Sequence, residues 1–471
     1  MSRARIVVAG DALLDRDIEG AVDRLSPDAP VPVVDEGTNR VRPGGAGLAA
    51  LLLARDGCEV ALVTALGDDR AGREVSSLLA KAGVEVVDLG LEGATPEKVR
   101  VRASGRSLLR IDRGGAPSRA GRFSPAAGAL VGRADGVLVS DYGRGLAADE
   151  GMRACISLLP AGVPVVWDPH PRGAPPPPHV RLVTPNLREA EHFGKGTASG
   201  PGFIAAAGAL GRRLVAEWRA GAVAITLGGR GALVVEGANP PLVTPAPVTS
   251  EGDSCGAGDR FAASATRALT AGALPSEAVC SAVVDASRFV GAGGAGTVMD
   301  EPEARGTGDV RARDGAAPPP DAYELARAIR SRGGTVVATG GCFDLLHAGH
   351  VATLEAARSL GDCLIVLLNS DASVRRLKGP DRPLVPAGDR AALLAALEAV
   401  DGVIVFDEDT PERALDGLRP DLFAKGGDYA LGPLPEASLL GSWGGEAVVL
   451  PYLRGRSTTH LLQEVARRDI P

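Results

Sequence analysis

Short apolar runs alternate with amphipathic stretches through the first 300 residues of the chain. Six of these runs are typical of buried parallel strands, at 5–10, 59–67, 136–141, 163–168, 180–186 and 222–229. Stretches with helical spacing occur at 46–57, at 71–83 and after Gly258. The alternation predicts an α/β domain whose parallel sheet is covered on both faces by helices.

The same pattern starts again beyond residue 330. It predicts strands at 335–339, 363–370, 402–406, 421–426 and 446–453, and helices at 350–361, 388–399, 411–418 and from Ser457 onward. Residues 301–320 between the two regions read EPEARGTGDVRARDGAAPPP, which lacks apolar periodicity and is typical of an extended linker. We therefore predict an α/β domain over 1–305, a linker and lead-in over 306–330, and a smaller Rossmann-like α/β domain over 331–471.

Composition narrows the classes of protein that the chain could be. The 471 residues carry a net charge of −7, so we expect no nucleic-acid partner. Only five of the 51 basic residues are lysines, a bias that we attribute to a GC-rich genome and not to a nucleic-acid surface. No run of 18 apolar residues is present, so we expect no membrane span. The six cysteines are scattered without a CxxC pair, which favours a reducing, cytoplasmic location over a disulfide framework or a zinc site.

Two histidines stand three positions apart in TGGCFDLLHAGHVATLEAARSLGD, residues 339–362. His347 and His350 lie where a predicted strand turns into a predicted helix, which is where α/β sheets bind ligands. The glycines around them allow a phosphate to approach the backbone, and a helix N-terminus supplies free N–H donors. Taken alone, such a pair is more often capping or buried, and zinc is disfavoured because HExxH is absent.

The segment resembles the HxGH motif of the nucleotidyltransferases, and LNSDASVRRLKG (368–379), KGGDY (425–429) and RSTTH (456–460) resemble further motifs of that superfamily in order. The resemblance implies attack of a substrate phosphate on the α-phosphate of a nucleoside triphosphate, with His347 and His350 as catalytic residues. Asp344 and Asp371 are metal or ribose contacts, or else turn and cap residues. The nucleotide-binding residues that it implies are Gly341, Phe343, Asp344, Gly349, Asp371, Lys378, Lys425, Ser457, Thr458 and Thr459.

A second glycine-rich motif lies in SEGDSCGAGDRFAASA, residues 250–265. The amides of Gly256, Ala257 and Gly258 precede a predicted helix, so they can form a nest for a transferring phosphoryl group. The carboxylate of Asp259, which follows, could accept the proton of a substrate hydroxyl. GAGD as an isolated string is more often only the turn that starts a helix.

This motif resembles the signature of the ribokinase-like PfkB sugar kinases, and three other segments support it: RPGGAG (42–47), VTPNLREAE (183–191) and TLGGRGALV (226–234). The resemblance implies Asp259 as the catalytic residue and Glu189 as a contact of Mg²⁺ at the ATP site. The implied ATP-binding residues are Asn186, Glu189, Thr226, Gly228, Gly231, Gly256, Ala257 and Gly258.

The order of the two motif sets, together with GDALLDRDIEGAVDRLSPDAPVPVV (10–34) and LVSDYGRG (138–145), is similar to a family of bifunctional enzymes. These are heptose 7-phosphate kinases fused to heptose 1-phosphate adenylyltransferases that make ADP-heptose from ATP. The resemblance implies sugar binding by Asp15, Gly44 and Gly45, with Arg102 and Arg110 as candidates for the 7-phosphate, because a guanidinium fork matches a phosphate. It also implies Mg²⁺ as cofactor and a homodimer formed through the kinase domain.

Four positions depart from the family pattern. Leu48 stands where the kinases usually have Asn, Cys255 and Arg260 flank GAGD where Thr is typical, and Gly340 replaces an Asn before the Gly-x-Phe-Asp segment. Two alternatives therefore stay open. The N-terminal domain could be a degenerate kinase that serves in binding or dimerisation, or both domains could act on another sugar phosphate with CTP as donor.

Overall fold

The computed structural model describes residues 3–103, 106–114, 119–199, 202–237, 239–247, 253–299, 321–427 and 434–451. Contacts between Cα atoms divide the chain into two compact units. The first consists of Met1–Phe193, Leu214–Gly229 and Ala246–Pro302, and the second contains Gly194–Arg213, Arg230–Pro245 and the later part of the chain. The units are not contiguous in sequence, so the single boundary near residue 305 stays a prediction.

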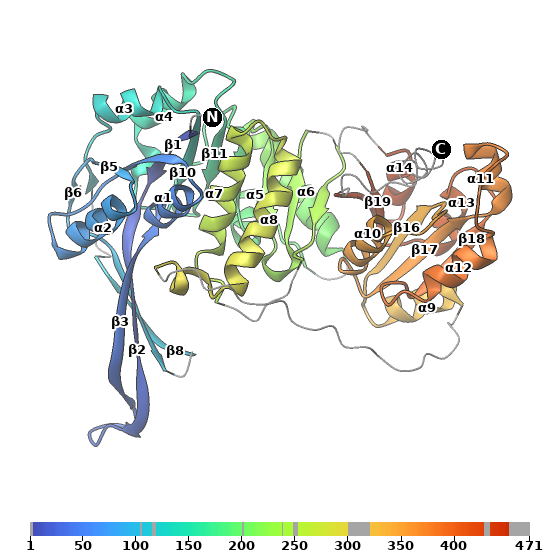
Figure 1. Ribbon diagram of the computed structural model, residues 1–471, viewed down its shortest axis with the longest axis horizontal. Coiled ribbons are helices and arrows are strands. Elements are labelled where there is room, and N and C mark those ends of the chain that lie inside the picture. The colour runs from blue at the N-terminus through green and yellow to red at the C-terminus, as the bar shows by residue number, and fades with distance from the viewer. Residues whose placement is uncertain are drawn as a thin grey trace, which may run out of the picture. The chain divides into compact units, whose positions relative to one another are not determined.

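A parallel sheet forms the core of the first unit (Figure 1). Its strands follow the order β12-β11-β10-β1-β4-β5, with β13 beside β12. Their bounds are β1 Arg5–Gly10, β4 Glu59–Thr64, β5 Glu85–Asp88, β10 Gly136–Ser140, β11 Val165–Asp168, β12 Leu182–Val183 and β13 Val223–Thr226. All six predicted strands are present, although β12 keeps only two residues of its apolar run.

Helices pack on this sheet and place the GAGD segment beside it. α1 (Ala46–Arg55) packs on β1 and β4, and α7 (Ala257–Thr270) packs against α1, β10, β11 and α8 (Pro275–Gly291). The other helices of this part of the chain are α2 Arg70–Lys81, α3 Pro125–Val131, α4 Glu150–Ser157, α5 Leu187–Gly194 and α6 Phe203–Trp218. The three helices predicted before residue 300 are present within a few residues of their expected ends.

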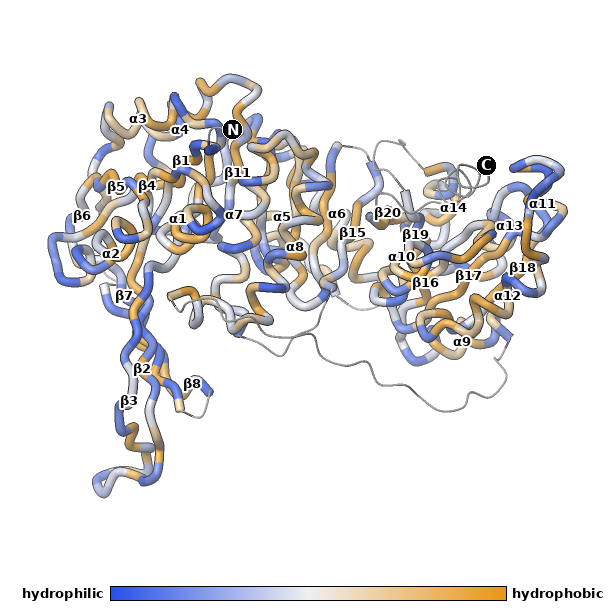
Figure 2. The backbone as a smooth tube through the Cα atoms, viewed as in Figure 1, coloured by the Kyte–Doolittle hydropathy of each residue, from blue (hydrophilic) through white to orange (hydrophobic). Residues whose placement is uncertain are grey.

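A second sheet, which we did not predict, extends from the body of the first unit (Figure 1). Its order is β3-β2-β7-β8, with bounds Pro32–Gly45, Ala12–Leu25, Glu97–Ala103 and Arg106–Arg113. The outer parts of β2 and β3 are exposed and mix polar with apolar residues (Figure 2). Side chains at alternate positions share one face of such a sheet, so its register decides which residues meet.

The second unit holds its own parallel sheet, in the order β18-β17-β16-β19-β20. Its strands are β16 Val336–Gly341, β17 Cys363–Asn369, β18 Gly402–Phe406, β19 Leu422–Gly426 and β20 Glu446–Leu450. Its helices are α9 Ala322–Ser331, α10 Ala348–Arg358, α11 Asp371–Lys378, α12 Ala387–Ala395, α13 Glu412–Leu418 and α14 Ala437–Gly441. The predicted strands and helices up to residue 451 are confirmed, while the helix expected from Ser457 lies outside the described residues.

Short elements complete the described chain. An antiparallel pair, β14 Ala232–Val235 and β15 Leu242–Thr244, follows β13 in sequence. A smaller pair joins β6 Leu91–Glu92 to β9 Arg119–Ala120. In the described part of the chain no helix is both long and apolar enough to cross a membrane.

Candidate active sites

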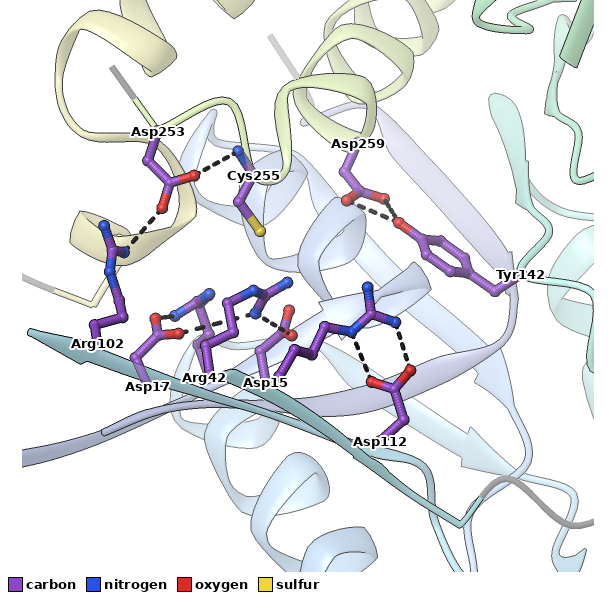
Figure 3. A network of polar contacts seen from close by, with 11 residues as sticks. Asp15, Asp17, Arg42, Arg102, Asp112, Tyr142, Asp253, Cys255 and Asp259 are labelled. Atoms are coloured by element: carbon purple, nitrogen blue, oxygen red, sulfur yellow. Dashed lines mark hydrogen bonds and ion pairs between the residues drawn. The ribbon is translucent and has the colours of Figure 1, made fainter. Parts of the chain in front are cut away.

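The polar face of the β3-β2-β7-β8 sheet brings together charged residues that lie far apart in sequence. The register pairs Asp15 on β2 with Arg42 on β3 and with Lys98 on β7, and it pairs Asp17 with Arg100. Nη1 of Arg100 donates to Oδ1 of Asp15 at 2.7 Å, and Arg42 forms an ion pair with Asp17. These carboxylates are therefore held in place by guanidinium groups before any substrate arrives (Figure 3).

Two glycines at the inner end of β3 allow this arrangement. A Cβ at Gly44 would lie 2.5 Å from Oδ2 of Asp15, so any larger residue would displace that carboxylate. Gly45 has a φ of 60°, a backbone conformation that favours glycine. The structure thus places the three predicted sugar-binding residues of this segment next to one another.

Asp259 lies in the first turn of α7 and is only 6% exposed. Its carboxylate accepts a hydrogen bond from the phenol of Tyr142, whose Oη lies 2.9 Å from Oδ1 and 3.0 Å from Oδ2 (Figure 3). Burial raises the pKa of Asp259 to about 7, and the charge of Asp15 adds to this, while the Tyr142 bond and Lys98 act in the opposite direction. A carboxyl group with such a pKa can exchange a proton near neutral pH.

Two of the four departures from the kinase pattern have packing partners in the structure. Leu48 is buried in α1, and its Cδ2 would lie 2.7 Å from a Cβ at Gly256. Arg260 donates to both carboxylate oxygens of Asp56, at 3.1 and 2.8 Å, and also reaches Asp285. Both side chains therefore connect α7 with its neighbours.

The two candidate phosphate-binding arginines are each paired with a carboxylate. Nη1 of Arg102 donates to Asp253 at 2.9 Å, and Arg110 binds Asp112 with two bonds of 2.7 and 2.6 Å (Figure 3). Lys98 lies on β7 with Asp112 of β8 opposite it, and its Nζ is 5.0 Å from the centre of the Tyr142 ring. Sequence reasoning missed Lys98 and Tyr142, although Tyr142 is part of the quoted LVSDYGRG segment.

The predicted ATP residues around α5 form a capping box. The Asn186 backbone N–H donates to Glu189 at 2.8 Å, and the Glu189 N–H donates to the Asn186 side chain at 3.0 Å. Asn186 also bridges to Thr226 at the end of β13, which brings these two predicted residues together. Gly228 and Gly231, with φ values of 61° and 92°, form the turn that follows.

Further acidic residues near Glu189 escaped the sequence analysis. Burial raises the pKa of Asp141 to about 7 and that of Asp168 well above its usual range, and repulsion from Glu189 adds to both. Burial likewise raises the pKa of Glu189. Within the described ranges, no three of the His, Cys, Asp and Glu side chains form a group that could hold a metal ion alone. Mg²⁺ commonly uses one or two carboxylates together with nucleotide phosphates, so these residues fit an ion that arrives with ATP.

In the second unit the two predicted histidines are in contact. His347 is the N-cap of α10, and its Nδ1 accepts a hydrogen bond from the Gly349 N–H at 3.1 Å. The rings of His347 and His350 stack with centroids 3.9 Å apart, and the Phe343 ring lies 5.3 Å from His350. Burial lowers the pKa of His350 to about 4, and the nearby His347 and Lys378 add to this shift. His350 is therefore a neutral imidazole at physiological pH.

The carboxylates near the histidines hold protein groups. Asp344 accepts hydrogen bonds from the backbone N–H groups of Leu384 and Val385 at 3.0 and 3.1 Å, and it forms an ion pair with Arg382 at 2.7 Å. Asp371 begins α11 and pairs with the buried Arg390 at 2.7 Å. The sequence left two interpretations open for Asp344 and Asp371: metal or ribose contacts, or turn and cap residues. The observed contacts are those of residues that hold a loop and a helix.

The remaining predicted transferase residues are placed as follows. Gly341 ends β16, Gly349 is buried in the first turn of α10, and Lys425 on β19 pairs with Glu436 at 3.1 Å. Arg390, which sequence reasoning missed, also donates to the carbonyls of Cys342 and Asn369 at 2.6 and 2.9 Å. The predicted Ser457, Thr458 and Thr459 lie outside the described residues.

Comparisons with known proteins also divide the chain into a kinase region and a nucleotidyltransferase region. Residues 3–302 match the pfkB family carbohydrate kinase model, and residues 338–439 match the cytidylyltransferase-like model. The fold of the first region is similar to that of phosphofructokinase-2 from Escherichia coli in complex with substrates and products. The TM-score is 0.50 at 18% identity, with 62% of this chain and 95% of the other covered.

Similarity also extends along nearly the whole chain. The bifunctional protein HldE of Streptomyces coelicolor is 55% identical over 464 residues, which cover 98% of this chain and 97% of the relative. That of Azotobacter vinelandii is 39% identical over 480 residues, 99% and 98% of the two chains. The expected fold class is confirmed. The chain belongs to the HldE family of bifunctional enzymes, which combine a heptose 7-phosphate kinase with a heptose 1-phosphate adenylyltransferase in ADP-heptose biosynthesis.

Proposed function

We propose that the first unit phosphorylates the anomeric hydroxyl of D-glycero-β-D-manno-heptose 7-phosphate with Asp259 as the general base. The observation that carries this proposal is the buried carboxylate of Asp259 in the first turn of α7, which is close enough to Asp15 for the two charges to repel each other. Asp259 takes the hydroxyl proton while the sugar oxygen bonds to the γ-phosphorus, and the bond to the β,γ-bridging oxygen breaks to release ADP.

Other residues bind and orient the two substrates of this reaction. Asp15, Gly44 and Gly45 hold sugar hydroxyls, and the amides at 256–258 donate to the transferring phosphoryl group. Arg102 and Arg110 bind the 7-phosphate, which requires each to exchange a carboxylate partner for the phosphate. Asn186 and Glu189 serve Mg²⁺ that enters as magnesium–ATP, and Thr226, Gly228 and Gly231 lie along the nucleotide.

In the second unit we place adenylyl transfer at the end of α10 that carries His347 and His350. An oxygen of heptose 1-phosphate bonds to the α-phosphorus of ATP as the bond to the pyrophosphate group breaks. Lys378, whose charge is close enough to lower the pKa of His350, neutralises part of the triphosphate. Gly341, Phe343 and Gly349 contact the nucleotide, and Lys425 and 457–459 complete the phosphate contacts.

The structure also supports the expected homodimer through the kinase region. The face of the β3-β2-β7-β8 sheet opposite to Asp15 carries Leu109 and Ile111, which are 56% and 38% exposed. Val31, 51% exposed, lies near the outer end of the same sheet. Exposed apolar groups on a projecting sheet favour association with another surface. Analytical ultracentrifugation of the wild-type chain and of Leu109→Asp tests the proposed dimer. A dimer is expected for the wild type and a monomer for the variant.

We also propose a cytoplasmic location for the protein. All six cysteines lie in the part of the chain that the structure describes, and no disulfide joins any two of them. Thiols are typical of reducing compartments. Fractionation of the producing cells tests the proposal, with adenylyl transfer activity expected in the cytoplasmic fraction.

Two incubations with the same preparation test the proposed chemistry. Magnesium–ATP with heptose 7-phosphate should release ADP, and magnesium–ATP with heptose 1-phosphate should release pyrophosphate. The absence of ADP above a control without sugar would contradict the kinase proposal. Release of pyrophosphate with CTP but not with ATP would contradict the adenylyl assignment.

A further inference from the structure

Tyr142 has no role in the reaction described so far, yet it contacts the proposed base directly. It follows β10 in the sequence SDYGRG, and 117 positions separate it from Asp259. Its Oη lies at nearly equal distances from the two carboxylate oxygens, 2.9 and 3.0 Å (Figure 3). One phenol proton can be donated to either oxygen, so the other oxygen keeps its lone pairs for a substrate hydroxyl.

The tyrosine is fixed from several sides. Its backbone N–H donates to Oδ2 of Asp11 at 3.0 Å, and the Arg144 N–H donates to the same oxygen at 3.0 Å, which holds the turn after β10. Its ring lies against Gly45, where a Cβ would approach Cδ2 and Cε2 to 3.3 Å. The position of the phenol is therefore set by backbone and packing contacts that are independent of Asp259.

Lys98 completes the surroundings of the tyrosine ring. Its ammonium group lies 5.0 Å from the ring centre, a distance typical of a cation–π contact. In the part of the chain that the structure describes, Nζ of Lys98 makes no hydrogen bond or ion pair. Burial lowers the pKa of Lys98, while Asp15 and Asp259 raise it, so the three groups interact electrostatically.

We propose that Tyr142 is a positioning residue that holds the Asp259 carboxylate for proton transfer, and that Lys98 over its ring supplies a positive charge that favours the ionised form of this carboxylate. This inference rests on the proposed role of Asp259 as general base. Burial raises the pKa of Tyr142 well above its usual range, so the phenol remains a donor throughout the reaction. The sugar proton therefore ends on Asp259, and Tyr142 keeps its own.

The charged groups around Asp259 predict the direction of the pH effect. Asp15 from β2 and Asp168 from the end of β11 repel its ionised form, whereas Lys98 from β7 and the Tyr142 hydrogen bond favour it. Removal of either favourable group raises the pKa of Asp259. The acid limb of the kinase profile of kcat/KM against pH should then move to higher pH.

Tyr142→Phe removes only the hydroxyl and keeps the ring against Gly45 and under Lys98. We expect its kcat for ADP release to fall about 10- to 100-fold, as for other small errors of positioning, and its acid limb to move to higher pH. Lys98→Met should move the acid limb in the same direction, and Lys98→Arg should restore it. Tyr323→Phe, which removes a phenol hydroxyl from α9 in the second unit, is the matched control. Urea denaturation of each preparation verifies that both units are folded, because pyrophosphate release reports only on the second unit.

The outcomes separate this inference from the proposed function. If Asp259→Asn retains wild-type ADP release, the role of Asp259 as base is wrong. If Asp259→Asn is inactive while Tyr142→Phe and Lys98→Met keep the wild-type kcat and acid limb, only the positioning role is wrong. A shift of the acid limb in both variants, absent in Tyr323→Phe, supports the inference.

Discussion

The imidazole rings of His347 and His350 stack with their centroids 3.9 Å apart and their planes 23° from parallel. Two protonated rings could not share this contact without strong repulsion. Burial lowers the pKa of His350 to about 4, so at most one of the two rings is protonated at neutral pH.

The His350 pKa shift predicts an acid-sensitive transferase unit. In the unfolded chain His350 takes up a proton near pH 6.5, whereas in the folded chain it does so only near pH 4. The stability that depends on neutral His350 is thus present above pH 6.5 and is lost as the pH falls toward 4. Calorimetry should show a smaller loss of melting temperature over this range in His350→Gln. His179→Asn, at an exposed histidine, should follow the wild type.

Gly256 is expected to tolerate no side chain. An alanine there would meet Cδ2 of Leu48 at 2.7 Å and would have to keep a φ of 80°. We expect Gly256→Ala to lower the free energy of unfolding by about 1–3 kcal/mol, measured by urea denaturation. Gly258→Ala is the matched control for stability, because a Cβ there has nothing within 4 Å and φ is not positive. Equal losses in the two variants would show that the contact with Leu48 and the positive φ do not limit the side chain at position 256.

Arg260 is expected to act in stability and not in substrate binding. Its pairing with Asp56 and Asp285 is largely shielded from solvent, so Arg260→Ala leaves these two carboxylates with Arg267 as their remaining cationic partner, at 3.3 Å from each. We expect a loss of about 1–3 kcal/mol in urea denaturation with an unchanged KM for ATP. Arg5→Ala, which breaks the exposed pair with Glu59, should cost less than about 1 kcal/mol. A rise in the KM for ATP without loss of stability would overturn this assignment.

Asp259 should lower stability at alkaline pH. In the folded chain its pKa is raised to about 7 from 3.8, so ionisation is suppressed by burial. The folded state therefore loses stability as the pH rises from about 4 through 7, and the cost is complete above 7. Asp259→Asn should raise the melting temperature at pH 8 and change it little at pH 4.5. An equal effect at both pH values would contradict the buried, pH-dependent carboxyl.

Strands that are covered on both faces could be predicted from the sequence, whereas strands with exposed outer parts could not. β10 and β17 are continuous apolar runs because both faces of their sheets are covered, and this pattern is visible in sequence. β2 and β3 were missed as strands because their outer parts are exposed and carry charges at many positions. Their pairing with each other and with β7 holds them extended, and no local signal reports such pairing.

The site residues show the same division. The GAGD and HxGH motifs are local, so their glycines, carboxylate and histidines could be named from sequence. The contact of Tyr142 with Asp259 joins the end of β10 to the first turn of α7. The position of Lys98 depends on the register of β7 against β2. The pairing of Arg102 and Arg110 with carboxylates was equally hidden, since the acidic partner of Arg102 lies 151 positions away.

We propose that two independent sites share this chain, one at Asp259 and one at the His347–His350 pair. The most direct measurement compares ADP release from heptose 7-phosphate with pyrophosphate release from heptose 1-phosphate in two variants. Asp259→Asn should lose the first activity by about 10²- to 10⁴-fold and keep the second, and His350→Ala should show the reverse. Loss of both activities in either variant while the chain remains folded would contradict independent sites, as would retention of both.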